Sequence, residues 1–140
     1  MNVSSLAALV PFPDMLSYGT SKLALEHLTL HAARELQPKG IAVNCFRIDI
    51  GVASEGFLAN MPGVDHSQWE PSEVAAEGIV WMLSQPPEYT GRRESMYQLR
   101  HRESIMASRL AHPRDDGPTP TELYNGLYES ELSHFIEPYG

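Results

Sequence analysis

The sequence is poor in cysteine, in basic residues and in long apolar runs. Its 140 residues include one cysteine, Cys45, which excludes a disulfide within the chain and fits a reducing compartment. Ten lysines and arginines stand against 18 acidic residues, and the resulting net charge of −8 disfavours nucleic acid and anionic membranes as partners. No apolar stretch approaches the roughly 18 residues of a membrane span, and no basic run with an apolar core opens the chain. We therefore expect a soluble, cytoplasmic protein that binds neither nucleic acid nor membranes.

A tyrosine and a lysine, Tyr18 and Lys22, stand four residues apart. On a helix, two such side chains leave the same face with their Cβ atoms roughly 5–6 Å apart. A cation this close favours the ionised form of a phenol, which makes Tyr18 a candidate proton donor and acceptor. Ser5 precedes Tyr18 by 13 residues and can hydrogen-bond the same substrate oxygen from the end of a strand. Ser5, Tyr18 and Lys22 are therefore the candidate catalytic residues.

Three stretches of the sequence resemble the short-chain dehydrogenase/reductase family. They are Asn2–Ser5 with the alanines at positions 7 and 8, Tyr18–Glu26, and Gly40–Cys45. In that family a serine at such a strand end, a tyrosine and a lysine at these spacings form the catalytic set, and Ser5, Tyr18 and Lys22 match it. The resemblance implies an α/β fold with a parallel sheet and flanking helices, and an oxidoreductase that uses NAD or NADP.

The residues that bind the dinucleotide in this family have no counterpart in the sequence. No G-x-x-x-G-x-G pattern is present, whereas family members use such a turn to hold the pyrophosphate at a helix N-terminus. Ile48 and Asp49 stand where most relatives have a Pro-Gly pair at the end of a strand. The chain therefore resembles the C-terminal, catalytic half of a short-chain dehydrogenase without its N-terminal nucleotide-binding half. We expect no bound cofactor.

The pattern of apolar residues predicts a truncated, Rossmann-like α/β unit with a short parallel sheet. About three strands are expected, ending at Ser5, covering 41–50 and covering 95–99. Helices between them give right-handed crossovers and a layered core. We assign residues 1–99 to this domain and residues 100–140 to a C-terminal extension, which is partly helical, with an amphipathic helix predicted over 121–135.

The longest predicted helix covers residues 18–36, with Ser17 as its N-cap. Its apolar residues recur with helical spacing, at positions 25, 28, 32, 33 and 36. Leu23 and Leu30 add a second apolar side, so the helix is expected to be buried on two faces. We therefore predict a homodimer or tetramer formed through helix 18–36. The alternative is that the C-terminal extension folds back over this surface. A further helix is predicted after Pro71, with Ser72 as N-cap.

Asp49, Phe57 and Met61 are the candidate residues of a substrate pocket. Asp49 lies toward the end of the second predicted strand. It either orients a substrate, acts as an acid or base, or forms an ion pair with Arg47. The ion pair is the simplest of these three interpretations. Phe57 and Met61 belong to a segment that contains a predicted turn. They either line an apolar pocket or cap the core.

His27 and His31 have the i, i+4 spacing that can bind zinc on a helix. No third ligand is placed near them in the sequence, and a pair of solvated histidines on a helix face explains them more simply. We therefore predict no metal site.

Two classes of function fit these residues. In the first, Lys22 activates Tyr18, the tyrosinate activates Ser5 or a water, and an activated ester or related acyl substrate is hydrolysed without a cofactor. In the second, the chain is an NAD(P)-dependent oxidoreductase of alcohols or ketones that acts only with a complementing nucleotide-binding half, or an inert homologue. The missing phosphate-binding turn favours the cofactor-independent hydrolase, with a small molecule as its substrate. A scaffold that only binds a partner is a third possibility.

Overall fold

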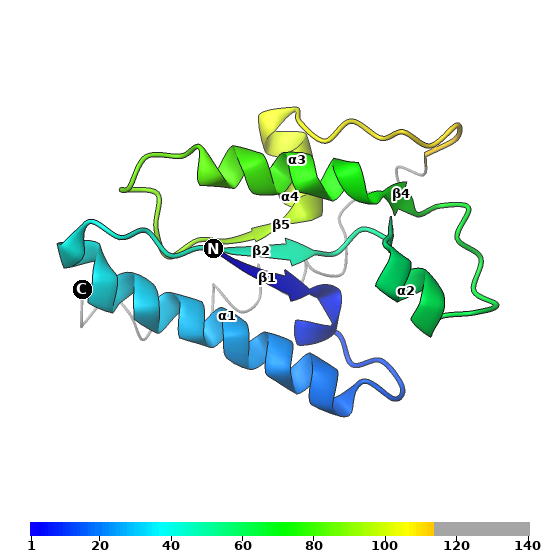
Figure 1. Cartoon of the computed structure of the whole chain (residues 1–140), viewed down its shortest axis with the longest axis horizontal. Helices are drawn as coiled ribbons and strands as arrows, with labels where there is room; N and C mark the ends of the chain where they lie inside the picture. The colour runs from blue at the N-terminus through cyan, green and yellow to red at the C-terminus, as the bar shows by residue number, and fades with distance from the viewer. Residues whose placement is uncertain (114–140) are drawn as a thin grey trace.

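The fold is taken from a computed structural model that describes residues 1–113 (Figure 1). Strands and helices alternate along this part of the chain. In order, the elements are β1 (Asn2–Ser5), η1 (Leu6–Ala8), α1 (Leu16–Leu36), η2 (Gln37–Lys39), β2 (Cys45–Ile48), β3 (Val52–Ala53), α2 (Glu55–Asn60), β4 (Glu70–Pro71), α3 (Ser72–Leu83), β5 (Arg93–Ser95) and α4 (Met96–Glu103). The helix predicted over 121–135 lies outside the described residues.

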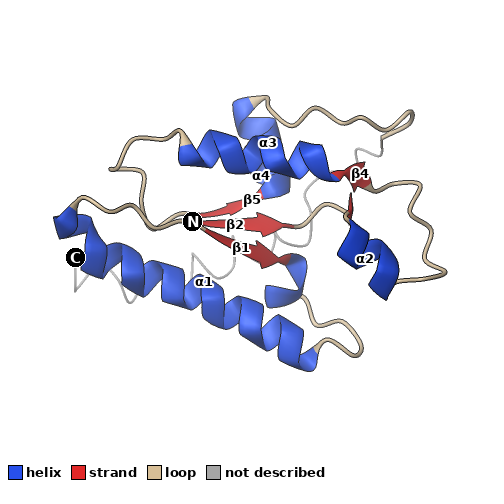
Figure 2. Cartoon of the chain, viewed as in Figure 1, coloured by secondary structure: helices blue, strands red, loops and turns tan. Residues whose placement is uncertain are grey.

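The main sheet has three parallel strands in the order β1-β2-β5 (Figure 2). Its register pairs Ser5 with Ile48 and Arg47 with Ser95. The carboxyl ends of all three strands therefore meet at one edge of the sheet. A second, two-stranded parallel sheet joins β3 to β4. The short parallel sheet with flanking helices confirms the predicted α/β, Rossmann-like fold class.

The apolar core lies between β2, α3 and α4. Phe46 of β2 and Leu99 of α4 are completely buried, and Met106 beyond α4 packs with them. Gly78 lets α3 come this close, because a Cβ atom at this position would lie 2.5 Å from the Met106 sulfur and 2.7 Å from Phe46 Cζ. The core therefore continues past residue 99, where the domain boundary is predicted. Figure 1 shows α1 on the other side of the three strands from α3.

The strands are shorter than the sequence predicts. β2 covers only Cys45–Ile48 of the predicted strand 41–50, and the third strand is Arg93–Ser95 instead of 95–99. The chain turns into α4 directly after Ser95, because the Ser95 hydroxyl accepts a hydrogen bond from Gln98 N at 3.2 Å and caps this helix. The expected strand over 95–99 is therefore wrong.

The helix caps also differ from the prediction. α1 begins at Leu16, its N-cap is Met15, and no side chain caps it, so Ser17 lies inside the first turn. Ser72 is the first residue of α3, and Pro71 is its N-cap. Both helices thus start one or two residues earlier than expected, a difference within the usual scatter of helix ends.

The side of α1 that faces the sheet is more polar than the predicted apolar stripe. Glu26, Thr29 and Ala33 are buried, whereas Leu28 is 57% exposed. Thr29 accepts a hydrogen bond from the Asn2 side chain at 3.0 Å, which ties the helix to β1. Tyr18, Lys22 and Glu26 are spaced four residues apart and therefore lie along one side of α1. The catalytic candidates therefore lie on the side of α1 that packs on the sheet.

Among the helices of residues 1–113, none combines the length with the apolar composition that a bilayer crossing requires.

Candidate active site

Tyr18 and Lys22 come together at the start of α1, as predicted. The Lys22 ammonium lies 5.5 Å from the centroid of the Tyr18 ring, within the range of a cation–π contact. Lys22 Nζ also donates a hydrogen bond to the carbonyl oxygen of Val3 in β1 at 3.0 Å. The cation is thus fixed between the tyrosine and the first strand. Tyr18 itself remains 38% exposed and can be reached from solvent.

Ser5 is the last residue of β1 and caps η1. Its Oγ atom accepts a hydrogen bond from Ala7 N at 3.3 Å. Because a serine hydroxyl can accept and donate at the same time, this contact leaves the hydroxyl proton available for a substrate oxygen. The neighbouring Ser4 is buried and donates to the Lys22 carbonyl oxygen at 3.5 Å. Ser4 thus contacts α1 directly, whereas the hydrogen bond of Ser5 is to η1.

Gly19 allows this close approach of α1 to the end of β1. A Cβ atom at position 19 would lie 2.6 Å from the carbonyl oxygen of Ala7, closer than real Cβ contacts permit. A residue with any side chain would push the helix away from η1, and with it the neighbouring Tyr18. The glycine between the catalytic candidates is therefore a geometric requirement of the site.

A buried ion pair holds the same helix to the second strand. Arg47 Nε donates to Glu26 Oε1 at 2.7 Å and Arg47 Nη2 to Glu26 Oε2 at 2.5 Å, with both side chains 1% exposed. Arg93 of β5 lies 3.9 Å from the same carboxylate. Sequence reasoning paired Arg47 with Asp49 and missed Glu26. The signal was present, since single opposite charges within an apolar strand and on a buried helix face require partners.

Cys45 contributes no nucleophile to this region. Burial, and after it the negative charge of Glu26, raises the pKa of the Cys45 thiol to about 11. The thiol is therefore protonated at neutral pH. The reactive groups near the end of β1 are thus the serine hydroxyl, the phenol and the ammonium.

The predicted pocket residues Asp49, Phe57 and Met61 contact other parts of the chain. Asp49 follows β2, and its carboxylate accepts hydrogen bonds from Ser95 Oγ at 2.5 Å and from Tyr97 N at 3.0 Å, so it caps α4. Phe57, in α2, packs edge-on against Trp69 with ring centroids 5.3 Å apart. Met61 is the C-cap of α2. Asp49 thus has a structural role at the sheet edge that its position alone did not predict.

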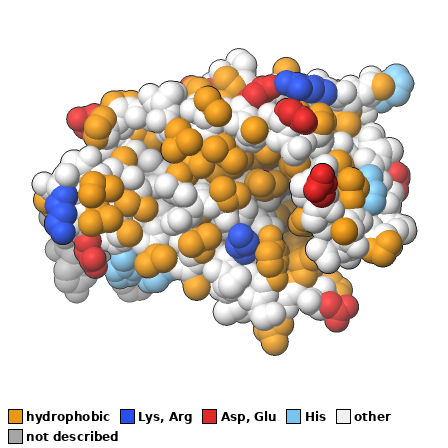
Figure 3. Space-filling model, in the orientation of Figure 1, with side chains coloured by type: hydrophobic (Ala, Val, Ile, Leu, Met, Phe, Trp, Pro, Cys, Tyr) orange, Lys and Arg blue, Asp and Glu red, His pale blue; other side chains and the backbone are white. Residues whose placement is uncertain are grey.

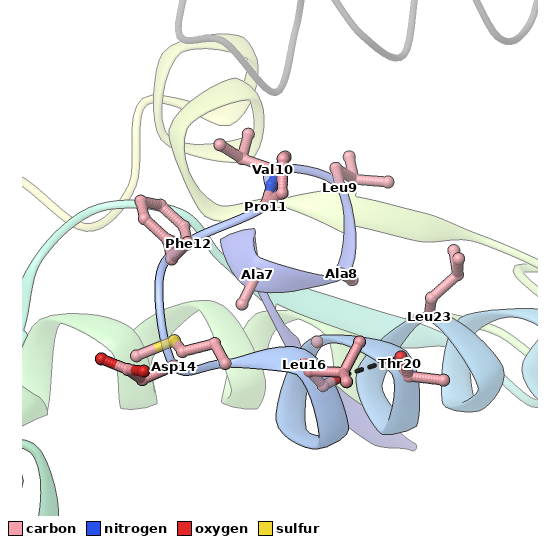
Figure 4. Close-up of a pocket in the computed structure, with 12 residues that line it drawn as sticks. Ala7, Ala8, Leu9, Val10, Pro11, Phe12, Asp14, Leu16, Thr20 and Leu23 are labelled. Atoms are coloured by element: carbon pink, nitrogen blue, oxygen red, sulfur yellow. Dashed lines mark hydrogen bonds between the residues drawn. The ribbon is translucent and has the colours of Figure 1, made fainter.

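A hollow of about 350 Å³ opens between the segment after β1 and the start of α1 (Figure 4). Its walls come from residues 7–12 and from the first turns of α1, and they are mostly apolar. Gly19 and Ala7 belong to the wall, so the hollow adjoins the close contact between α1 and η1. Asp49, Phe57 and Met61 do not line it.

A family model described as short chain dehydrogenase matches residues 1–52. Residues 1–52 resemble the short-chain dehydrogenases. The matched range includes Ser5, Tyr18 and Lys22. The α/β architecture of the described residues matches the Rossmann-like folds of solved members of this family.

Curated relatives and solved structures support the same family. The chain is 46% identical over 46 residues to L-2,3-butanediol dehydrogenase of Corynebacterium glutamicum, covering 33% of this chain and 18% of the relative. It is 33% identical over 98 residues to a chanoclavine-I dehydrogenase of Claviceps purpurea, covering 61% and 37%. The structure of the angucycline C-6 ketoreductase LanV with bound NADP is 30% identical with a TM-score of 0.56, covering 68% of this chain and 40% of that one.

The chain thus spans well under half the length of these relatives. All three are dehydrogenases or reductases. The comparisons therefore support the oxidoreductase alternative better than the hydrolase, which gains no support from them.

The described residues do not fit a dinucleotide by themselves. A pyrophosphate site requires a strand, a glycine-rich turn and the N-terminus of a following helix. β1 leads into η1 and then into a segment with prolines at positions 11 and 13. β2 leads to Asp49, which caps α4, and β5 leads directly to the Ser95 cap of α4. None of the three strand ends of the main sheet therefore forms a pyrophosphate cradle.

Proposed function

We propose that this chain carries the proton-transfer residues of a short-chain oxidoreductase that acts on a small alcohol or ketone. The observation that carries the proposal is the position of the Lys22 ammonium, 5.5 Å from the Tyr18 ring and hydrogen-bonded at 3.0 Å to Val3 O, two residues before Ser5. A cation fixed in this place stabilises the negative charge that develops on the phenol oxygen when its proton leaves. The names of two of these relatives, a butanediol dehydrogenase and a ketoreductase, support alcohols and ketones as the substrate class.

Each of the three residues has one task in the proposed reaction. The Tyr18 hydroxyl gives its proton to the carbonyl oxygen of the substrate during reduction, and takes it back from the alcohol during oxidation. The Ser5 hydroxyl donates a hydrogen bond to the same oxygen and holds it in place. Lys22 compensates the charge on the phenolate. Hydride transfer requires a nicotinamide nucleotide, whose binding residues another polypeptide segment would have to supply.

The sheet offers a place for such a segment. In the order β1-β2-β5, the strand β1 is an edge, paired among the described strands only with β2. An edge strand presents unpaired backbone groups to which a further strand can be added. Apolar side chains also gather over the centre of the face between α1 and α3 (Figure 3). Both features support a complementing polypeptide that packs beside β1.

Complementation tests the proposal. The full chain is coexpressed with the N-terminal nucleotide-binding part of L-2,3-butanediol dehydrogenase, and carbonyl-dependent oxidation of NADH and NADPH is measured. We expect turnover by the pair, and Tyr18→Phe lowers it by about 10²–10⁴-fold, the usual contribution of a general acid. Lys22→Ala lowers it as well. Lys39→Ala, which removes an exposed lysine, is the matched control for Lys22→Ala and keeps the activity of the native pair.

Two results would contradict the proposal. One is turnover that survives Tyr18→Phe unchanged in a variant with native circular dichroism. The other is hydrolysis of p-nitrophenyl acetate by the chain alone that is lost in Ser5→Ala, which would support the cofactor-independent hydrolase instead.

A further inference from the structure

The exposed side of α1 carries two histidines whose ring nitrogens converge. His27 and His31 stand one helical turn apart, and their Nε2 atoms are 3.0 Å from each other. The ring centroids lie 4.6 Å apart with an interplanar angle of 66°. Both side chains are exposed. In this contact one imidazole donates an N–H hydrogen bond and the other accepts it. One proton therefore lies between two nitrogens that both bind metals well.

The separation of the two nitrogens matches one coordination geometry. Imidazole nitrogens bind divalent metals at about 2.0–2.1 Å, so two of them at adjacent positions, about 90° apart, are about 2.8–3.0 Å from each other. A tetrahedral angle would place them about 3.4 Å apart. The observed 3.0 Å therefore fits neighbouring positions of a square-planar or tetragonal ion better than a tetrahedral one. Tetragonal nitrogen and oxygen sites are typical of Cu(II) and Ni(II).

We propose that His27 and His31 form an exchangeable transition-metal site that prefers Cu(II), with Ni(II) and Zn(II) bound more weakly. When the ion binds, the donating imidazole changes tautomer: its proton moves through solvent from Nε2 to Nδ1, and both Nε2 lone pairs are then available to the metal. Within residues 1–113, no three histidine, cysteine or acidic side chains are grouped closely enough to hold a metal together. Water therefore fills the remaining positions, and the ion stays open to exchange. The site lies on the exposed part of α1, away from the buried Glu26, and is independent of the proposed oxidoreductase activity.

Calorimetry and electron paramagnetic resonance test the site on the full chain. We expect one Cu(II) ion per chain, with the spectral splitting of two equatorial nitrogens. His27→Gln and His31→Gln each weaken Cu(II) binding by about tenfold or more, since removing even a supporting contact of a metal ligand costs about 10–100-fold. Glutamine is a good helix former, so α1 keeps its helicity. Ni(II) and Zn(II) bind more weakly than Cu(II), as the general affinity order requires.

The control is His101→Gln, which removes an exposed histidine of α4 whose ring contacts Tyr97 at a tilted angle. Its Cu(II) affinity equals that of the native chain. The inference is overturned if the double variant His27→Gln/His31→Gln binds Cu(II) as tightly as the native chain. It is also overturned if His101→Gln loses as much affinity as either single variant.

Discussion

Gly19 determines how closely the start of α1 approaches the end of β1. A Cβ atom at this position would lie 2.6 Å from a backbone oxygen, that of Ala7, which cannot rotate away as a flexible side chain would. We predict that Gly19→Ala lowers the free energy of unfolding by about 1–3 kcal/mol, the usual cost of forcing extra volume into a packed site. Urea denaturation measures this loss.

The control for this substitution is Gly56→Ala in α2. A Cβ atom at position 56 meets nothing within 4 Å. Alanine in a helix is more favourable than glycine by about 0.5–1 kcal/mol, so this variant is as stable as the native chain or slightly more stable. Equal unfolding curves for Gly19→Ala and the native chain would show that the contact with Ala7 is not required.

At the scale of single residues, the sequence predicts local spacing well and long-range partners poorly. Tyr18 and Lys22 meet because four residues on a helix always bring side chains to one face. The role of Asp49 could not be read in this way. Its partners Ser95 and Tyr97 are more than 40 residues away along the chain and reach it only through the parallel register of β2 and β5.

At the scale of secondary-structure elements, α1 is held to the sheet by a buried charge pair. Glu26 and Arg47 are both about 1% exposed and share two hydrogen bonds. Removing one charge of such a pair leaves the other in a medium that solvates it poorly, at a cost of about 3–5 kcal/mol. We predict this loss for Glu26→Gln in urea denaturation. Glu35→Gln, an exposed glutamate of the same helix, changes stability by less than about 0.5 kcal/mol.

A stability of Glu26→Gln equal to that of Glu35→Gln would contradict this role of the pair.

The pair also explains why the predicted apolar stripe of α1 was partly wrong. Apolar spacing assigned Leu28 to the buried side, whereas the helix turns Glu26 inward to meet Arg47 and leaves Leu28 exposed. Periodicity of apolar residues cannot detect a helix face that is buried through a charge.

At the scale of the whole molecule, the sequence predicts the parallel α/β architecture. It does not predict which polypeptide covers the apolar surface that this architecture leaves open. Leu16 is 87% exposed, and Leu28 lies on the outer side of α1. The homodimer or tetramer through helix 18–36 therefore stays a prediction, because a complementing segment beside β1 would also cover apolar surface on this face of the molecule (Figure 3). Both arrangements follow from the same physical need to bury apolar surface that the described residues leave open.

In the proposed function, Ser5 and Tyr18 act as one unit on one substrate oxygen. The most direct test is a double-mutant cycle of kcat/KM for carbonyl reduction by the complemented full chain, with Ser5→Ala, Tyr18→Phe and the double variant. Residues that act together lose most of their effect at the first substitution. The double variant should therefore be within about threefold of Tyr18→Phe alone. Losses that multiply, so that Ser5→Ala costs the same with or without Tyr18, would contradict the account.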